Sequence, residues 1–418
     1  MSENLQTVTV IGLGHIGLST AALLASKGFQ VHGCDVNPKI IEGIKQGKPH
    51  IVEKDLDEIL QKITKEGRLT ASFSPAPADI FIIAVPTPFK DNYKPDLSYI
   101  EAAIKAVAPH VKPNNLIVLE STSPVGTTEK IVEWLTKLRP DLKMPSKGTS
   151  HPDQVSVAYC SERVLPGQIL YELTENNRVL GGIDQESGLK ANHFYQKFVN
   201  GKIHLTNART AEMIKLAENS FRDTNIAFAN ELSLVCEKLD MNVWEVIRLA
   251  NDHPRVNILK PGPGVGGHCI AVDPWFIIDA APDEAKLMRT AREVNDSKPP
   301  HVLKLIKSHI KQIKNPVIAC LGLTFKADVN DLRESPALQI VESLAKEKIG
   351  DLLLVEPYIE ALPSSLQSFG KSVQLVNLTE ALKAAHLVVL LVDHKIFYQV
   401  DPSLLKEKRV VDTRGIWA

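Results

Sequence analysis

The stretch that decides the fold is TVTVIGLGHIGLSTAALLASKGFQVHGCD, which occupies residues 7–35. An apolar run indicates a first strand at 8–11, helical spacing follows from Ile16 to Lys27, and 29–34 indicates a second strand. Three glycines with the spacing Gly-x-Gly-x-x-Gly join the first strand to the helix, and an acidic residue ends the second strand. This combination predicts a dinucleotide-binding βαβ unit. Its four residues are Gly12, Gly14, Gly17 and Asp35.

Each of these residues has a physical task in such a unit. Gly12 permits the tight turn, Gly14 lets the backbone approach a pyrophosphate, and Gly17 allows the helix to pack closely on the strand. The helix N-terminus faces the phosphates. Asp35 can accept hydrogen bonds from a ribose, and its charge disfavours a 2′-phosphate, so the expected cofactor is NAD. The alternative is a glycine-punctuated turn that binds nothing.

The same alternation of strands and helices continues along the chain. Strands are expected at 80–85 and 116–119, and the pattern resumes after Pro299 and Pro300. A long helix is expected from Thr206 to about Leu239, because the region lacks glycine and proline. The predicted fold class is α/β, with two Rossmann-like parallel-sheet domains joined by a long-helix central domain. The expected domains are 1–200 for NAD, 201–300 for the helices and 301–418 for a second α/β domain. The later strands are expected at 317–321, 351–355, 387–392 and 409–411, with a helix at 335–346.

The composition narrows the class of protein. The 418 residues are 44% hydrophobic and 23% charged, as in ordinary soluble globular proteins. The net charge of -1 argues against a nucleic-acid partner. No apolar run is long enough for a membrane helix, and the N-terminus lacks the features of a signal peptide. The five dispersed cysteines favour a reducing cytoplasm, without a disulfide framework or a metal site.

A second glycine-rich stretch, PGPGVGGHCIAVDP at residues 261–274, surrounds a cysteine. Four glycines within six residues imply that the backbone approaches something closely. Cys269 follows this loop directly, and Asp273 lies four residues further on. The pattern is typical of a presented nucleophile, whose thiolate would be favoured by a helix beginning here. The alternative is a buried structural cysteine beside a loop that merely turns.

Polar residues on the long helix form a second candidate group. Lys215 and Asn219 lie at positions i and i+4, so they share one face of the helix. Glu212 and Arg222 extend this polar stripe. The alternative is an ordinary solvated helix face.

Charged residues also follow predicted strands, where ligands bind in open α/β sheets. Glu162 and Arg163 follow a strand that ends near Cys160. Lys326 and Arg333 follow the strand at 317–321, in a domain without the full glycine signature. Cations there could neutralise phosphates. The alternative for both pairs is surface charge.

Seven motifs together resemble one family, the nucleotide-sugar 6-dehydrogenases of the UDP-glucose/GDP-mannose dehydrogenase family. The resemblance implies an NAD domain, a central helical region that forms a homodimer, and a C-terminal UDP-binding domain. It also implies a four-electron oxidation of a sugar C6 hydroxyl to a carboxylate, using two NAD and one water. In chain order the motifs are GLGHIG, AVPTP, ESTSPVGTTEK, YCSERVLPG, AEMIKLAENSFRDTNIAFANELS, PGPGVGGHCIAVDPWF and GLTFKADVNDLRESPA.

The resemblance also implies residue roles. Cys269 would trap the aldehyde as a thiohemiacetal and then carry a thioester. The other residues implied in catalysis are Lys215, Asn219 and Asp273, for oxyanions and water, and Glu162 with Thr122, for hydrolysis. The residues implied in cofactor binding are Gly12, Gly14, His15, Ile16, Gly17, Asp35, Pro86, Thr87, Thr122 and Arg333. Those implied in UDP-sugar binding are Glu162, Arg163, Val164, Lys215, Asn219, Arg255, Gly266 and Lys326.

Several hypotheses remain open for the substrate and the activity. The motifs resemble most closely the family members that act on UDP-N-acetyl-D-mannosamine, so this sugar is expected. UDP-N-acetylglucosamine and UDP-glucose are alternatives. A two-electron β-hydroxyacid dehydrogenase would share the lysine-on-helix arrangement without needing the cysteine loop. A non-catalytic NAD-binding scaffold is the alternative from another class.

Overall fold

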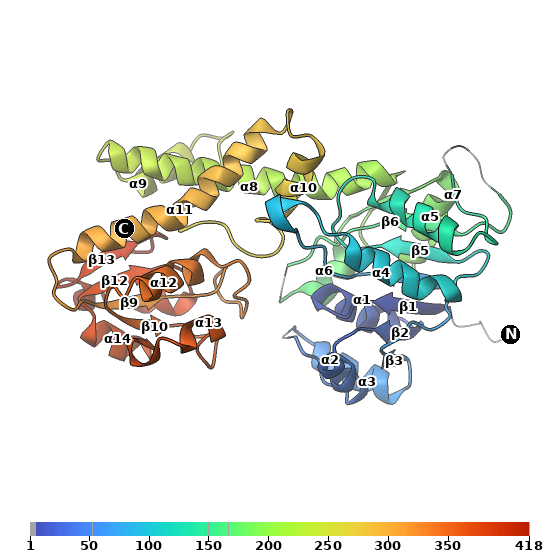
Figure 1. Ribbon diagram of the computed structural model, residues 1–418, viewed down its shortest axis with the longest axis horizontal. Coiled ribbons are helices and arrows are strands. Elements are labelled where there is room, and N and C mark those ends of the chain that lie inside the picture. The colour runs from blue at the N-terminus through green and yellow to red at the C-terminus, as the bar shows by residue number, and fades with distance from the viewer. Residues whose placement is uncertain (1–5, 52, 147, 149–150, 166, 418) are drawn as a thin grey trace. The chain divides into compact units, whose positions relative to one another are not determined.

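The computed structural model describes residues 6–51, 53–146, 148, 151–165 and 167–417. The chain divides into two compact units (Figure 1). The N-terminal unit comprises residues 1–217 with 275–280, and the C-terminal unit comprises 218–274 with 281–418. Each unit contains one largely parallel β-sheet.

The N-terminal unit is built on an eight-stranded sheet with the order β3-β2-β1-β4-β5-β6-β7-β8. Neighbouring strands are parallel except for β6 and β7, which are antiparallel. The order reverses between β1 and β4, which creates a crevice at the carboxyl ends of the strands. The strands are β1 (Thr7–Ile11), β2 (Gln30–Cys34), β3 (Leu69–Ser72), β4 (Ile80–Ile83), β5 (Leu116–Leu119), β6 (Ser156–Tyr159), β7 (Arg178–Gly182) and β8 (Ile203–Asn207).

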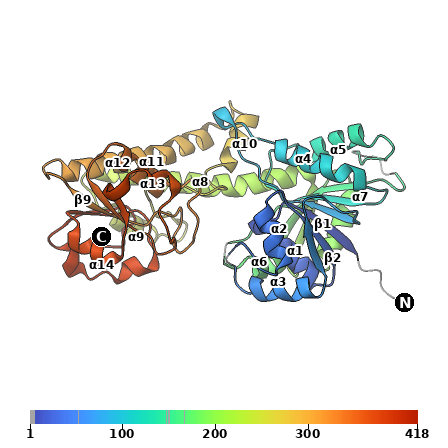
Figure 2. The same ribbon diagram turned by 60° about the horizontal axis from the view of Figure 1, so that its bottom comes forward.

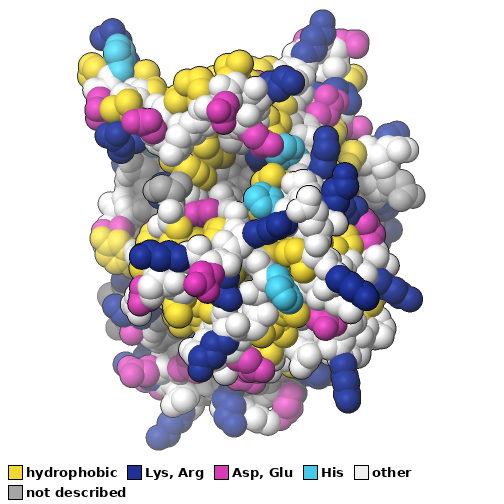
Figure 3. Space-filling model, turned by 90° about the vertical axis from the view of Figure 1, so that its left-hand side faces the viewer, with side chains coloured by type: hydrophobic (Ala, Val, Ile, Leu, Met, Phe, Trp, Pro, Cys, Tyr) yellow, Lys and Arg dark blue, Asp and Glu magenta, His cyan; other side chains and the backbone are white. Residues whose placement is uncertain are grey.

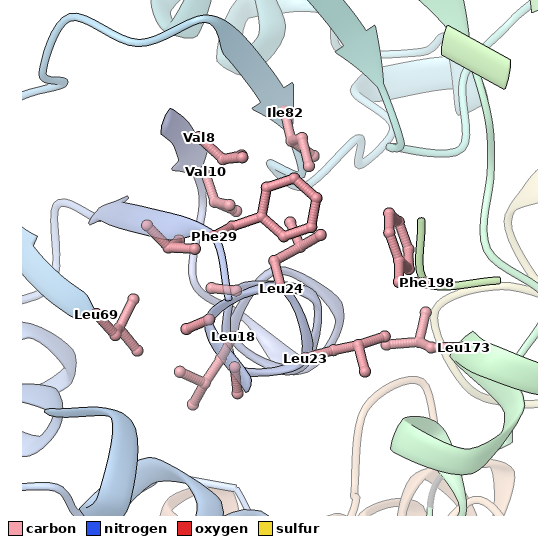
Figure 4. Packing of buried hydrophobic residues seen from close by; sticks show 14 of the residues in the cluster. Val8, Val10, Leu18, Leu23, Leu24, Phe29, Leu69, Ile82, Leu173 and Phe198 are labelled. Carbon is pink, nitrogen blue, oxygen red and sulfur yellow. The ribbon is translucent and has the colours of Figure 1, made fainter. Parts of the chain in front are cut away.

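Helices cover both faces of this sheet, so its central strands are apolar on both sides. Both ribbon views show α4 and α5 on the opposite face from α1 and α3 (Figures 1 and 2). Figure 4 shows the core on the α1 side, where Leu18 and Leu24 of α1 lie among Val8, Val10 and Ile82 of the sheet. The helices are α1 (His15–Ser26), α2 (Pro38–Lys45), α3 (Leu56–Lys65), α4 (Ser98–Val107), α5 (Thr127–Leu138), α6 (Ile169–Glu175) and α7 (Gln185–Tyr195).

Four helices separate the two sheets along the chain: α8 (Ala208–Lys238), α9 (Val243–Ala250), α10 (Asp273–Ala280) and α11 (Lys286–Ile310). The 31 residues of α8 correspond to about 46 Å at 1.5 Å per residue. The helix α11 continues through Pro299 and Pro300. Beyond the prolines, Val302, Ile306 and Ile310 are buried in the C-terminal core, and this packing maintains the helix.

The C-terminal unit contains a second sheet, entirely parallel, with the order β11-β10-β9-β12-β13. Residues of α11, α12 and α13 pack in the core on one face, and residues of α14 pack in the core on the other. Its strands are β9 (Val317–Leu321), β10 (Asp351–Val355), β11 (Val373–Leu375), β12 (Leu387–Leu390) and β13 (Arg409–Asp412). Its remaining helices are α12 (Pro336–Lys346), α13 (Ser364–Gln367) and α14 (Leu378–Ala384).

The predicted fold class is confirmed, with two Rossmann-like sheets and long helices between them. The long helix expected from Thr206 to about Leu239 spans Ala208–Lys238. The helix α11 continues to Ile310, so residue 300, the expected start of the second α/β domain, lies inside a helix. The strand expected at 317–321 follows as β9. Among the described helices, none combines the length and apolar character needed to cross a membrane.

Candidate active site

The glycine turn between β1 and α1 has the close contacts that its spacing predicted. Gly12 has a φ of +89°, and a Cβ there would lie 2.5 Å from the carbonyl oxygen of Ala84. A Cβ on Gly17 would lie 1.8 Å from the carbonyl oxygen of Gly12. At Gly14, by contrast, a Cβ would meet no atom within 4 Å. The backbone is therefore open at the position where the sequence places a pyrophosphate.

The polar groups around the turn also fit NAD. His15 and Ile16 open α1, and no side chain caps its N-terminus, so the first amides of the helix can face an anion. The carboxylate of Asp35 follows β2 and accepts the amide of Leu13 at 2.8 Å and the amide of Asn37 at 2.8 Å. A carboxylate has further lone pairs, so Asp35 can still accept ribose hydroxyls.

Two loops that follow neighbouring strands come together beside this turn. Pro86 and Thr87 follow β4, and Thr122 follows β5. The hydroxyl of Thr87 donates a hydrogen bond of 2.5 Å to the carbonyl of Thr122. The structure thus joins Thr87, which was expected to bind the cofactor, to Thr122, which was expected both to bind the cofactor and to assist hydrolysis.

Glu162 and Lys215 form a polar pair in the N-terminal unit. The Lys215 ammonium donates to the Glu162 carbonyl at 2.9 Å, and its Nζ lies 3.9 Å from the Glu162 carboxylate. The other carboxylate oxygen of Glu162 accepts the amide of Val164 at 2.7 Å. A cation beside a carboxylate and a carbonyl is suited to charge stabilisation and to proton transfer.

The segment that carries Glu162, Arg163 and Val164 is held by partners that sequence reasoning missed. The carbonyl of Arg163 accepts from Asn176 at 2.8 Å. Further along the same loop, the amides of Gly167 and Ile169 donate to the carboxylate of Glu53, each at 2.8 Å. Glu53 is buried and lies more than a hundred residues away in the chain. No local pattern around Glu53 indicates this contact.

Glu212 was considered above as part of a polar stripe on the long helix, with a solvated helix face as the alternative. In the structure it has a different role. It is buried, and its carboxylate accepts the amides of Gly126 and Thr128 and the hydroxyl of Thr128 at 2.6–2.8 Å. These amides belong to the start of α5, so Glu212 caps that helix. Glu212 therefore links α8, three residues before Lys215, to the loop that follows Thr122.

The C-terminal unit contains the second polar pair. The side chain of Asn219 donates a short hydrogen bond to the carboxylate of Asp273. Asp273 opens α10, and its amide donates to the carbonyl of Cys269 at 2.8 Å. The helix begins four residues after Cys269 rather than at the cysteine itself. Asn219 lies one turn after Lys215 on α8, on the same face of that helix.

The described cysteines differ in their surroundings. Burial raises the pKa of Cys34 to about 11, that of Cys160 to about 11 and that of Cys320 to about 12. These three thiols are poor nucleophiles, since the thiolate is the reactive form. Cys236 is buried, whereas Cys269 is half-buried. Cys269 is therefore the strongest candidate for a reacting thiol.

The glycine loop before Cys269 packs against the segment that follows β9. A Cβ on Gly266 would lie 2.3 Å from the Glu334 carbonyl oxygen, and one on Gly267, where φ is +82°, would lie 2.9 Å from the Phe325 ring. The Gly267 amide donates to the Arg333 carbonyl at 3.1 Å. The glycines therefore serve close packing between two loops of the same unit.

The predicted cations have different environments. The Arg333 guanidinium forms two parallel hydrogen bonds to Asp331, which raise its pKa. Lys326 is exposed at the carboxyl end of β9, and Arg255 is exposed after α9. Figure 3 shows Lys and Arg side chains interspersed with Asp and Glu on the face in view. A phosphate-binding site on this unit would therefore depend on a few individual Lys or Arg side chains.

A cavity of about 510 Å³ lies within the C-terminal unit. Pro261 and Gly262 of the glycine loop line it, together with Asp412 and Thr413 at the carboxyl end of β13. Ligands of open parallel sheets bind at this edge.

Comparison with known proteins agrees with this architecture. Three domain models of the UDP-glucose/GDP-mannose dehydrogenase family match the chain: the NAD binding domain at residues 6–199, the central domain at 209–297 and the UDP binding domain at 319–418. An NDP-N-acetyl-D-galactosaminuronic acid dehydrogenase of Ralstonia nicotianae is 54% identical, over 99% of this chain and 96% of that protein. A UDP-N-acetyl-D-mannosamine dehydrogenase of Campylobacter jejuni is 56% identical, over 94% and 96%.

The solved structure of UDP-D-ManNAc dehydrogenase from Pyrococcus horikoshii is also similar. Its TM-score is 0.87 at 37% identity, and the match covers 99% of this chain and 96% of that one. The resemblance drawn from the motifs is confirmed, as is the presence of an NAD-binding domain. The chain belongs to the UDP-glucose/GDP-mannose dehydrogenase family, whose members are NAD-dependent nucleotide-sugar dehydrogenases.

Proposed function

We propose that this protein oxidises the C6 hydroxyl of UDP-N-acetyl-D-mannosamine to the carboxylate, giving UDP-N-acetyl-D-mannosaminuronate with two NAD consumed per sugar. One observation carries the proposal. Asp273, four residues after Cys269, is paired with Asn219, and Asn219 lies one helical turn from Lys215, which is paired with Glu162. A thiol, an ammonium and two carboxylates are the groups that such an oxidation requires.

In the first oxidation the alcohol loses a proton and a hydride to become an aldehyde. Bound NAD would accept the hydride in this step and again in the second oxidation. Lys215 and Asn219 stabilise the negative charge that develops on the C6 oxygen. Asp273 orients Asn219 through their hydrogen bond.

The cysteine makes the second oxidation possible. The Cys269 thiolate adds to the aldehyde carbon, and the oxygen takes up a proton, which gives a thiohemiacetal. Loss of that proton and of a second hydride then leaves a thioester. Because the aldehyde stays bound to sulfur, no reactive aldehyde is released.

Hydrolysis of the thioester completes the reaction. A water molecule attacks the carbonyl carbon, the carbon–sulfur bond breaks, and the carboxylate and the thiol are formed. Glu162 is the proposed base for this water, with help from Thr122, and Lys215 would stabilise the oxyanion. The Lys215–Glu162 pair keeps an ammonium beside the carboxylate that accepts the proton.

We propose that different domains bind NAD and UDP. Residues 1–200 hold NAD through the glycine turn, Asp35 and the loops at Pro86 and Thr87. Residues 201–300 carry the catalytic groups of α8 and the cysteine loop. Residues 301–418 bind UDP through Lys326. The other proposed contacts are Arg163, Val164, Arg255 and Gly266 for the UDP-sugar, and His15, Ile16, Thr122 and Arg333 for NAD.

A homodimer is proposed from an exposed stripe on α8. Phe221, Phe228 and Val235 recur at seven-residue spacing, and 72%, 55% and 47% of their surfaces are exposed. Residues at this spacing lie on one face of a helix, and a second copy of the chain would bury it. Sedimentation tests this, because Phe228→Asp should convert dimers to monomers. Unchanged sedimentation would argue against this stripe as the interface.

The choice of sugar is tested by a panel of UDP-sugars, with NADH formation as the readout. The Ralstonia and Campylobacter relatives both carry names with N-acetylated sugars, which supports a 2-acetamido substrate. The panel should contain the UDP forms of N-acetylmannosamine, N-acetylglucosamine, N-acetylgalactosamine and glucose. The highest kcat/KM is expected for UDP-N-acetyl-D-mannosamine. Equal or faster turnover of UDP-glucose would overturn the choice.

A further inference from the structure

The C-terminal domain contains a buried histidine–carboxylate pair that the proposed reaction does not use. The Nε2 of His394 lies 3.0 Å from the carboxylate of Glu356, and neither side chain is exposed to solvent. His394 comes four residues after β12, and Glu356 directly follows β10. Both residues are therefore at the carboxyl edge of the sheet, where ligands bind.

The hydrogen bonds of His394 define its protonation. The backbone amide of Asp328 donates to Nδ1 at 3.0 Å, so Nδ1 must be an acceptor without a proton. The proton then resides on Nε2, which donates to Glu356. In this arrangement the His394 ring connects a backbone amide to a carboxylate.

Glu356 has further partners on the same segment. One carboxylate oxygen accepts the amides of Leu323 at 2.7 Å and Thr324 at 3.1 Å. Burial alone would raise the pKa of Glu356. The hydrogen bonds from His394 and from the Leu323 amide outweigh burial, and the pKa lies below its ordinary value. Glu356 therefore remains an acceptor-only carboxylate.

These contacts fix the backbone on both sides of Lys326. Three amides of the segment 323–328 end on Glu356 or His394, and the hydroxyl of Thr324 donates to the Lys326 carbonyl at 2.9 Å. Neighbouring Phe325 lies against the glycine loop that precedes Cys269. The Lys326 side chain itself is exposed. The backbone is thus held rigidly while the side chain stays available for a ligand.

We propose that Glu356 and His394 are positioning residues that set Lys326 for the diphosphate of the UDP-sugar. The inference rests on the proposed function, because it takes UDP as the ligand of this edge. If the segment that carries the lysine were mobile, ligand binding would have to order it, and the conformational entropy lost would weaken binding. Fixing the segment beforehand removes this cost, so the pair tightens binding without contacting the ligand.

The test is UDP affinity, measured by titration calorimetry on the full-length protein. His394→Phe keeps a ring but removes both hydrogen bonds, and it should weaken UDP binding about tenfold. It should also raise the KM for the UDP-sugar much more than it lowers kcat. Affinity for NAD, which binds the N-terminal domain, should stay unchanged. His394→Asn, which can still accept the Asp328 amide, should recover part of the loss.

A matched control exists in the same domain. His386 also accepts a backbone amide on Nδ1, from Val317 at 3.0 Å, but at the amino end of β9. His386→Phe should leave UDP affinity as in the parent protein. If His394→Phe does not fold, His394→Asn and His394→Gln carry the comparison, because each keeps one of the two hydrogen bonds.

A double-mutant cycle tests whether the pair acts through Lys326. Once Lys326→Ala has removed the ammonium, adding His394→Phe should weaken UDP binding little further. Fully additive losses, or a folded His394→Phe protein with parental UDP affinity, would overturn the proposal. If the parent protein itself binds no UDP and oxidises no UDP-sugar, the proposed function fails as well. If the parent protein binds UDP and oxidises a UDP-sugar but the variants do not behave as expected, only the role of the Glu356–His394 pair is refuted.

Discussion

The two sheets use the same backbone turn for different purposes. Gly12 follows β1 with a φ of +89°, and Gly322 follows β9 with a φ of +90°. At either position a Cβ would lie well inside van der Waals contact distance, 2.5 Å from the Ala84 carbonyl oxygen and 2.4 Å from the Val392 Cβ. Each glycine donates its amide to the last strand residue of its neighbour, Cys34 in one domain and Val355 in the other.

The similarity extends to the acid that follows the neighbouring strand. The amide after Gly12, that of Leu13, donates to Asp35 at 2.8 Å, and the amide after Gly322, that of Leu323, donates to Glu356 at 2.7 Å. The difference is in what surrounds each acid. Asp35 remains half-buried, whereas Glu356 is buried against His394. Asp35 can therefore bind a ribose in the N-terminal domain, whereas the corresponding acid of the C-terminal domain, Glu356, is buried.

The comparison shows how one turn can serve two kinds of binding. In the N-terminal domain, open backbone at Gly14 and an accessible acid suit a dinucleotide. In the C-terminal domain, Thr324 occupies the corresponding place, and the acid holds the loop instead of a ligand. We therefore expect phosphate recognition there to depend on exposed cations, of which Lys326 is the proposed one.

The largest expected effect on stability and binding comes from replacing Gly12 or Gly322 with a residue that has a branched side chain. Gly12→Val and Gly322→Val each force a branched side chain into a left-handed backbone against neighbouring atoms, and each should cost about 3 kcal/mol or more. Gly12→Val should abolish NAD binding, and Gly322→Val should abolish UDP binding. Titration calorimetry with each nucleotide measures both. Loss of NAD binding in folded Gly322→Val would break the proposed division between the domains.

A smaller effect is expected from the two acids. Asp35→Asn should weaken NAD binding about tenfold, because a charged acceptor for the ribose is lost, with little effect on stability. Glu356→Gln should leave NAD affinity unchanged and lower the unfolding free energy by about 2 kcal/mol, because a buried acceptor is replaced by a donor. Equilibrium urea unfolding and NAD titration separate the two outcomes. The same response in both variants would contradict the comparison.

The smallest expected effect is a difference in pH response. The pKa of Glu356 is lowered in the folded protein, so its contribution to stability is present above the unfolded-state pKa and lost as pH falls through the folded pKa. Burial raises the pKa of Glu120 in the N-terminal domain, so its contribution is lost as pH rises through the folded pKa.

Hydrogen exchange of core amides in each domain measures this response. Acidification from neutral pH should weaken protection in the C-terminal domain, and Glu356→Gln should reduce that sensitivity. Glu120→Gln should leave the acid response of the C-terminal domain unchanged. An acid response in Glu356→Gln equal to that of the parent protein would refute the assignment.

Local patterns were sufficient to predict most of the fold. The strands at 116–119, 317–321 and 351–355 were predicted at their observed bounds, because short apolar runs bounded by turn residues have few alternative structures. The course of α11 through Pro299 and Pro300 was not predictable, because burial beyond the prolines maintains that helix. Such packing depends on residues that are distant in sequence.

The candidate site was predictable only where its residues lie in recognisable motifs. The glycine turn and the cysteine loop have such motifs. Glu53, Glu212 and His394 do not, because each acts on a segment far away in the chain through one to three hydrogen bonds. A buried polar side chain leaves no periodic trace in a sequence, so these residues required the structure.

The most direct test of the account is the number of NADH molecules formed per UDP-sugar consumed. The measurement uses limiting amounts of the UDP-sugar that the protein oxidises fastest, with excess NAD and quantification of the carboxylate product. The proposed thioester mechanism predicts two NADH and one uronate per sugar, and loss of uronate formation in Cys269→Ala. A ratio of one NADH, or full uronate formation in Cys269→Ala, would contradict oxidation through a cysteine thioester.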